Sequence, residues 1–349
     1  MSDILGLTLA HFPYLRLKHY HMPSVLTGNL GRGWIDKPHL KDPANWPQRM
    51  REEWGDDQGV ATGKKAQDHE IEQFRKVRAS LDDFKPDLIV IFYRDLGENF
   101  KNFAKVPYWI HGHEKVDLKL FQIFGNRENY WEEDPDRVDT IKGHPEAAYL
   151  LTRKLQDAGL NPLLALEPMA PLGLGHNALA TILHLDWDRH EFTTPVLPVA
   201  VDPFGFLRTR NNEGMSPWNR DLPRPLLPKE GFDLGRHVAR VFKASPWRVA
   251  LVAGTGWSHA NDSGWEFERL HQDIEADLER YEEWRNNQFD RWGENFNFED
   301  MEQHAQWELL MSIIIAGAMT EVGAKVRYSD FFASLVLNSS WVTTVFEVK

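Results

Sequence analysis

Apolar residues occur along this chain in two patterns, short continuous runs and helical spacings. Residues 4–12, 85–92, 194–202 and 248–256 are largely apolar runs, the pattern of strands buried on both faces of a sheet. Between the first two runs, residues 64–84 place apolar side chains at steps of three and four, as in an amphipathic helix: Ile71, Phe74, Val77, Leu81 and Phe84. Alternating strands and helices are typical of parallel sheets covered on both faces. We therefore predict an α/β protein with a central, mostly parallel sheet flanked by helices.

The rest of the chain continues this pattern after an irregular stretch, residues 13–60, that is rich in Pro, Gly and Trp. The expected elements are helices at 144–159 and 175–187, a long charged surface helix at 262–289, an apolar helix at Trp307–Met319, and closing strands at 325–331 and 339–348. Internal repeats and linker-like segments are absent from the sequence. We expect a single domain over residues 1–349.

Composition limits the possible partners. The net charge of -12 and the isoelectric point near 5.7 disfavour nucleic acid and anionic membranes as partners. We expect no membrane-spanning helix and no signal peptide, and hence a cytoplasmic protein. The absence of cysteine excludes disulfides, thiolate metal sites and a cysteine nucleophile. Any bound metal would need ligands from the 15 histidines and the carboxylates.

Four chemically active side chains stand at expected strand or helix ends. His11 ends the first strand, His176 and Glu308 open helices, and His259 follows the strand at 248–256. Ligands of open α/β sheets collect beyond the carboxyl ends of strands. Each residue alone has a structural explanation; Glu308, for example, would favourably meet the helix dipole. Together, two imidazoles and one carboxylate would suit non-heme Fe(II), and zinc sites use a similar ligand set.

Five motifs, in this order along nearly the whole chain, resemble the class III extradiol ring-cleavage dioxygenases, the relatives of the protocatechuate 4,5-dioxygenase β-subunit. They are "GLTLAHFPYL", "KPDLIVIF…ENF", "LGHNALATILHLDWDR…PVLPVAVDPFG", "RVALVAGTGWSHA" and "WELLMSIIIAGAM". The resemblance implies a single α/β domain in which two His and one Glu hold Fe(II). A catecholic substrate and O2 would bind at that iron, and a further His would shuttle protons.

Position by position, the resemblance assigns His11 and Glu308 to iron ligation, His176 to acid–base catalysis, and His259 to contacts around the substrate or the ligands. It also implies oligomerisation. A homo-oligomer is expected, and a hetero-oligomer with a related subunit is the other possibility. The Trp-bearing helix near 265–292 could supply the contact surface.

The chain departs from the family at the second iron-ligand histidine, where Leu96 stands in the turn after the second strand. The nearest substitutes are Asp95, which we take as the third ligand, then Glu98, His111 and His113. A catalytic histidine found in several members beyond residue 202 is replaced by "PFGFLRTR". Three arginines are possible anchors for a substrate carboxylate: Arg94, Arg208 and Arg210.

Three functional hypotheses follow. The first is an Fe(II) extradiol dioxygenase that opens the ring of a hydroxylated aromatic compound with O2. The second is a protein of the same fold that has lost oxygen chemistry, such as a partner subunit or a binding protein. The third is a hydrolase or lyase that uses Zn2+ at the same place.

Overall fold

A computed structural model of the chain describes residues 3–31, 38–100, 106–122, 127–190, 193–203, 210–211, 214–215, 224–259 and 270–348. In these residues eight strands form one sheet. In spatial order they are β11 (Ala324–Ser334), β12 (Ser339–Val348), β1 (Ile4–Leu9), β10 (Val249–Gly254), β2 (Leu88–Arg94), β7 (Val196–Val201), β3 (Tyr108–His111) and β6 (Leu163–Ala165). Two short pairs stand apart: β4 (Lys115–Leu118) with β5 (Asp139–Lys142), and β8 (Arg210–Asn211) with β9 (Gly214–Met215).

The centre of the sheet is parallel, as the sequence predicts. Strands β1, β10, β2 and β7 run in one direction and are in register, so that Leu9 pairs with Gly254 and Gly254 with Tyr93. Strand β3 is antiparallel to β7 and parallel to β6, while the hairpin of β11 and β12 adds antiparallel strands beside β1. The carboxyl ends of the four central strands therefore meet at one edge of the sheet.

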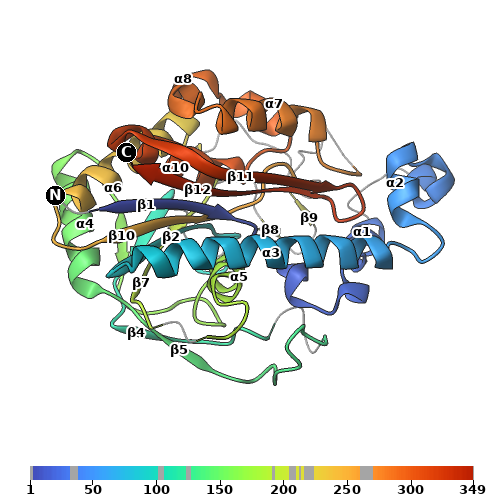
Figure 1. Ribbon diagram of the computed structural model, residues 1–349, viewed down its shortest axis with the longest axis horizontal. Coiled ribbons are helices and arrows are strands. Elements are labelled where there is room, and N and C mark those ends of the chain that lie inside the picture. The colour runs from blue at the N-terminus through green and yellow to red at the C-terminus, as the bar shows by residue number, and fades with distance from the viewer. Residues whose placement is uncertain are drawn as a thin grey trace.

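Helices cover both faces of this sheet (Figure 1). One face packs against α3 (Val60–Phe84) and α5 (His176–Leu185). The other packs against α4 (Pro145–Asp157), α6 (Pro228–Lys243) and α10 (Leu309–Val322). The described ranges contain five further helices: α1 (Ser24–Gly31), α2 (Gln48–Trp54), α7 (Ile274–Arg285), α8 (Trp292–Asn295) and α9 (Phe298–Gln303).

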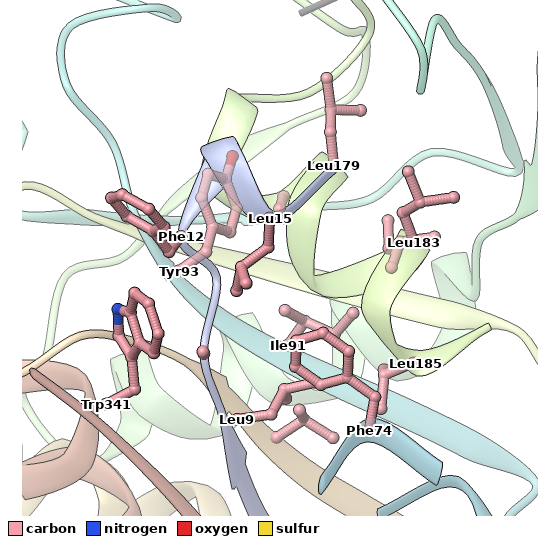
Figure 2. Close-up of a cluster of buried hydrophobic side chains, with 14 of the residues drawn as sticks. Leu9, Phe12, Leu15, Phe74, Ile91, Tyr93, Leu179, Leu183, Leu185 and Trp341 are labelled. Carbon is pink, nitrogen blue, oxygen red and sulfur yellow. The ribbon is translucent and has the colours of Figure 1, made fainter. Parts of the chain in front are cut away.

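Each central strand contributes to both cores because its side chains alternate between the faces. In β2, Leu88, Val90 and Phe92 belong to the core under α10, whereas Ile89, Ile91 and Tyr93 belong to the core under α3 and α5. Figure 2 shows part of the latter core, to which Phe74 of α3, Leu183 of α5 and Ile91 of β2 belong. This burial on both faces explains why these strands are continuous apolar runs in the sequence.

Two expectations need correction. Residues 13–60 contain α1, α2 and several 3-10 turns rather than irregular chain alone. The expected helix at 262–289 is only partly described, and its described part starts at 274 because Asp273 caps it through the backbone N–H of Ala276. Its Trp284 is fully buried against Trp257 and Trp292, so this tryptophan packs inside the protein and is not a surface for oligomerisation.

None of the helices in the described ranges has the length and apolar character needed to span a lipid bilayer.

Candidate functional site

Four polar side chains lie beyond the carboxyl ends of the central strands. His11 is two residues past β1, Arg94 is the last residue of β2, and Glu308 is the residue that precedes α10. His259, five residues past β10, acts electrostatically on Glu308. The structure thus brings together three residues that the sequence selected, His11, His259 and Glu308, although they are far apart in the chain.

Glu308 is the centre of this group. Its Oε1 lies 2.6 Å from Arg94 Nη2 and 3.4 Å from His11 Nε2. Its Oε2 accepts a hydrogen bond of 2.9 Å from the backbone N–H of Gly256. The side chain of Thr255 donates to the Glu308 carbonyl at 2.7 Å. A side chain at position 256 would put its Cβ only 2.2 Å from Oε2, so this close approach of backbone to carboxylate requires glycine.

Burial and charge act in opposite directions on Glu308. Burial raises the pKa of its carboxyl, but the positive charge of Arg94 and the hydrogen bond from His11 outweigh that effect and hold the pKa below its usual value. All three side chains are at most 5% exposed. The carboxylate is therefore ionised in the interior, and a guanidinium supplies most of its charge balance.

His11 has one ring nitrogen to spare. With Nε2 directed at the Glu308 carboxylate, Nε2 carries the proton and Nδ1 is left as an acceptor. That Nδ1 is buried and has no hydrogen-bond partner within the described part of the chain. Phe12, the next residue along the chain, packs its ring on Tyr14, Trp341 and His259, with centroids 5.4, 5.1 and 6.4 Å away.

Asp95 does not join this group, although it directly follows Arg94. Its Oδ1 accepts from Asn99 Nδ2 at 2.7 Å and its Oδ2 from the backbone N–H of Gly97 at 2.8 Å. Consecutive side chains of extended backbone point to opposite sides, so Arg94 faces Glu308 and Asp95 faces away. Burial and the nearby Glu98 raise the pKa of Asp95 to about 6.

His176 pairs with Glu98, one of the substitutes considered for the missing ligand. His176 Nδ1 lies 2.8 Å from Glu98 Oε1, and the backbone N–H of His176 donates to both carboxylate oxygens at 3.1 Å. Glu98 thus orients the imidazole at the start of α5. Both side chains are about one quarter exposed, unlike the Glu308 group. A carboxylate paired with an imidazole has the composition of an acid–base dyad. The two residues are 78 positions apart, so the sequence does not show that they are paired.

His111 and His113 belong to a buried hydrogen-bonded chain. His111 Nε2 accepts from Trp109 Nε1 at 3.2 Å, and Tyr93 Oη lies 2.8 Å from the same nitrogen. Since a tryptophan N–H can only donate, Nε2 is the acceptor and Tyr93 donates as well. His111 Nδ1 must then carry the proton and donate to His113 Nε2 at 3.0 Å. Burial lowers the pKa of His111 to about 3, so the ring is neutral and both of its nitrogens are in use.

These residues do not fit an Fe(II) site of two histidines and a carboxylate. His11 and Glu308 are close enough to bind one ion together. Asp95 is held by Gly97 and Asn99, and the side chain of Leu96 packs into the apolar core. Although His259 acts electrostatically on Glu308, the described residues contain no group of three His, Asp or Glu side chains placed to hold one metal ion. The positive charge beside Glu308 Oε1 is that of Arg94, where a divalent ion would meet direct repulsion.

The remaining arginines of interest, Arg208 and Arg210, have side chains outside the described residues. The sequence indicates Arg94 only as a possible substrate anchor. Its ion pair with Glu308 depends on how α10 packs on the sheet, which the sequence does not show. Comparison of the chain with models of known protein families and with curated proteins finds no match.

Proposed function

We propose that this chain is a non-oxidative protein with the fold of the class III extradiol dioxygenases. It binds a small hydroxylated aromatic compound next to the Arg94–Glu308 ion pair and does not open the ring with O2. The observation that carries the proposal is the 2.6 Å contact between Arg94 Nη2 and Glu308 Oε1, since this oxygen is also the one nearest His11. The guanidinium supplies a permanent positive charge at the carboxylate that would otherwise bind the iron.

Two further features favour a phenolic ligand. The unpartnered Nδ1 of His11 is a buried acceptor, and a ligand hydroxyl would satisfy it. The ring of Phe12, next in the sequence, offers a flat apolar contact for an aromatic ring. Binding, or service as the partner of a catalytic subunit, needs no more than these groups. Should proton transfer accompany binding, the dyad of Glu98 and His176 would supply it.

The second candidate function is the Fe(II) extradiol dioxygenase that the sequence predicts. It is favoured by the 3.4 Å separation of His11 Nε2 and Glu308 Oε1, a spacing that two ligands of one ion can have. This function requires Arg94 to leave Glu308 and another side chain to become the third ligand.

Metal loading separates the two functions. The protein is purified without oxygen and incubated with Fe(II), its iron content is measured by elemental analysis, and O2 uptake is followed with catechol. We expect well below one equivalent of iron per chain, no O2 uptake, and heat of catechol binding by calorimetry. About one equivalent of iron together with O2 uptake would instead establish the dioxygenase.

A variant pair provides the matched control. The double variant Arg94→Ala/Leu96→His removes the guanidinium and restores a histidine, so it should retain more iron than the wild type. Adding Glu308→Gln to that variant should abolish the gain, because the carboxylate ligand is then lost. Equal iron content in all three proteins would show that Arg94 is not what keeps the ion out.

A further inference from the structure

The outer face of α4 exposes apolar side chains that neither core covers. The residues of this helix that face the core recur at helical steps: Ala147, Ala148, Leu151 and Leu155. On the opposite side Tyr149 is 48% exposed, and the partly exposed Leu150 belongs to neither core. Figure 1 shows α4 at the left margin of the molecule. Two large apolar side chains therefore lie side by side near the middle of a surface helix.

This apolar pair is flanked by two residues of opposite charge. Glu146 precedes Tyr149 by three residues and Arg153 follows it by four, so the helical period places them on the same stripe as Tyr149 and Leu150. Both charged side chains are exposed, and neither forms an ion pair with another residue in the described ranges. Seven residues of helix separate the two by about 10 Å along the axis, so they do not meet each other within one chain.

The edge of the sheet next to α4 adds to this apolar surface. In the described sheet β6 is the last strand, and Leu166, just after it, is 59% exposed. A Cβ added at Gly112 would lie 3.5 Å from both Leu166 Cδ2 and Tyr149 Cε1, so these two side chains are neighbours. With Leu163 and Met169, they make up four of the eight large apolar side chains that are exposed in the described ranges. Their concentration in one segment, residues 149–169, indicates an interaction surface rather than scattered exposure.

The order of charges on the stripe indicates which partner fits it. The stripe is negative near the start of α4, apolar in the middle and positive towards the end of the helix. A second copy of the same helix, running in the opposite direction, presents these features in reverse order. Glu146 then lies opposite the partner's Arg153, and Tyr149 opposite the partner's Leu150. Each contact occurs twice around a two-fold axis, as in the self-complementary interfaces of most homodimers.

We propose that α4 and the adjoining edge at β6 form the interface of a homodimer, in which the two copies of α4 pack antiparallel. Tyr149, Leu150 and Leu166 form its apolar centre, and the pairs of Glu146 with the partner's Arg153 form its polar rim. The inference goes beyond the proposed function and does not depend on it, because none of these residues belongs to the candidate site.

Charge reversal tests the arrangement, with the mass of the full chain in solution measured by sedimentation equilibrium. We expect the wild type to reach twice the 40.5 kDa of one chain as its concentration rises. Glu146→Arg and Arg153→Glu should each weaken the dimer at least about tenfold, because each turns two attractive contacts into two repulsive ones. The double variant Glu146→Arg/Arg153→Glu should restore the dimer to within about threefold of the wild type. Since the two residues do not meet within one chain, only pairing between copies explains such a recovery.

Thermal stability separates this effect from damage to the helix. Glu146 and Arg153 both favour the dipole of α4, so each reversal should lower the Tm slightly and the double variant should lower it most. The Tm is measured at a concentration at which the wild type is monomeric. Dimerisation should thus recover in the variant whose fold is least stable.

A matched pair of apolar sites provides the control. Leu166→Glu in the proposed interface should leave the protein monomeric, whereas Leu278→Glu, at an exposed position of α7, should leave the dimer intact. A wild type that stays monomeric at every concentration would overturn the proposal, as would a dimer that tolerates Leu166→Glu and both single reversals. A dimer that the single reversals weaken and the double variant does not restore would overturn the antiparallel packing of α4.

Discussion

Buried charges at the carboxyl edge of the sheet differ in how they are compensated. Glu308 meets Arg94, His11 and a backbone N–H, whereas Arg16, the last residue of the 3-10 turn Pro13–Arg16, has two distant carbonyls as its hydrogen-bond partners among the described residues. Compensation within the protein favours stability, whereas a buried charge that lacks it is costly. The two arginines therefore call for opposite outcomes when they are removed: loss of stability for Arg94 and gain for Arg16.

The Arg94–Glu308 pair gives the first stability prediction. Glu308→Gln should lower the free energy of unfolding by about 3–5 kcal/mol, because it deprives a buried guanidinium of its carboxylate partner. Arg94→Met should also destabilise, and the double variant should lose less than the sum, with a coupling of about 0.5–3 kcal/mol. Urea denaturation of the four proteins at pH 7 measures this. Additive losses would show that the contact contributes no net stability.

The same pair sets a pH dependence. The pKa of Glu308 is lower in the folded protein than its usual value of 4.5, so the ionised carboxylate stabilises the fold above about pH 4.5. As the pH falls further, the unfolded chain takes up this proton first and the advantage declines. The stability difference between wild type and Glu308→Gln should therefore shrink below that pH.

The sequence was sufficient to select His11 and Glu308 because each stands at the end of an apolar run, where α/β proteins place ligands. It could not show that Arg94 pairs with Glu308, since that contact joins residues 214 positions apart through the packing of α10 on the sheet. Nor could it show which way the Asp95 side chain points, because this depends on the face of the sheet to which the preceding side chain, that of Arg94, points. The position of a residue in a motif predicts where it lies in the fold, whereas its contact partners depend on how the helices and strands pack.

Strands and helices were easier to predict than single contacts. The central strands β1, β2, β7 and β10 are buried on both faces, and so they appear as continuous apolar runs. The short outer strands β3 and β6 carry a weaker signal, and their direction is set by contacts with β7. In the second half of the chain, the close packing of α6 on α10 depends on glycines that a hydrophobic pattern does not register.

That helix pair gives the second stability prediction. A Cβ added at Gly235 of α6 would lie 1.8 Å from the carbonyl oxygen of Ile314, and one at Gly317 of α10 would lie 2.0 Å from that of Phe232. Because backbone atoms cannot move aside as side chains do, Gly235→Ala should destabilise by about 1–3 kcal/mol. The loss is read from the midpoint of urea denaturation.

Gly28→Ala in α1 is the matched control. Within the described part of the chain, no atom beyond the helix's own backbone lies within 4 Å of the Cβ position at residue 28, so the same change acts mainly through the conformational entropy of glycine. It should stabilise the protein by about 0.5–1 kcal/mol, because alanine has a higher helix propensity than glycine. A similar response at both glycines would contradict the tight crossing of α6 and α10.

The protein as a whole has two cores that share one sheet. The core on the α3 and α5 side and the core on the α4, α6 and α10 side take alternate residues from the same strands. Loss of the helices from one face would expose one side of every central strand and weaken the sheet that carries the other core. The stability of each core therefore depends on the other. The candidate site lies at the edge where both cores end, which ties its geometry to both.

This dependence predicts that the chain unfolds as one domain. Leu183→Ala on α5 and Ile314→Ala on α10 remove fully buried side chains from opposite cores, and each should cost about 2–5 kcal/mol. In both variants, tryptophan fluorescence, to which tryptophans of both cores contribute, and far-UV circular dichroism should shift to the same new urea midpoint. Leu278→Ala at a 43% exposed position should change it by less than about 0.5 kcal/mol. Were the fluorescence and dichroism transitions of Leu183→Ala to separate into different midpoints, the two faces would be separate folding units, and the site at their common edge could open without global unfolding.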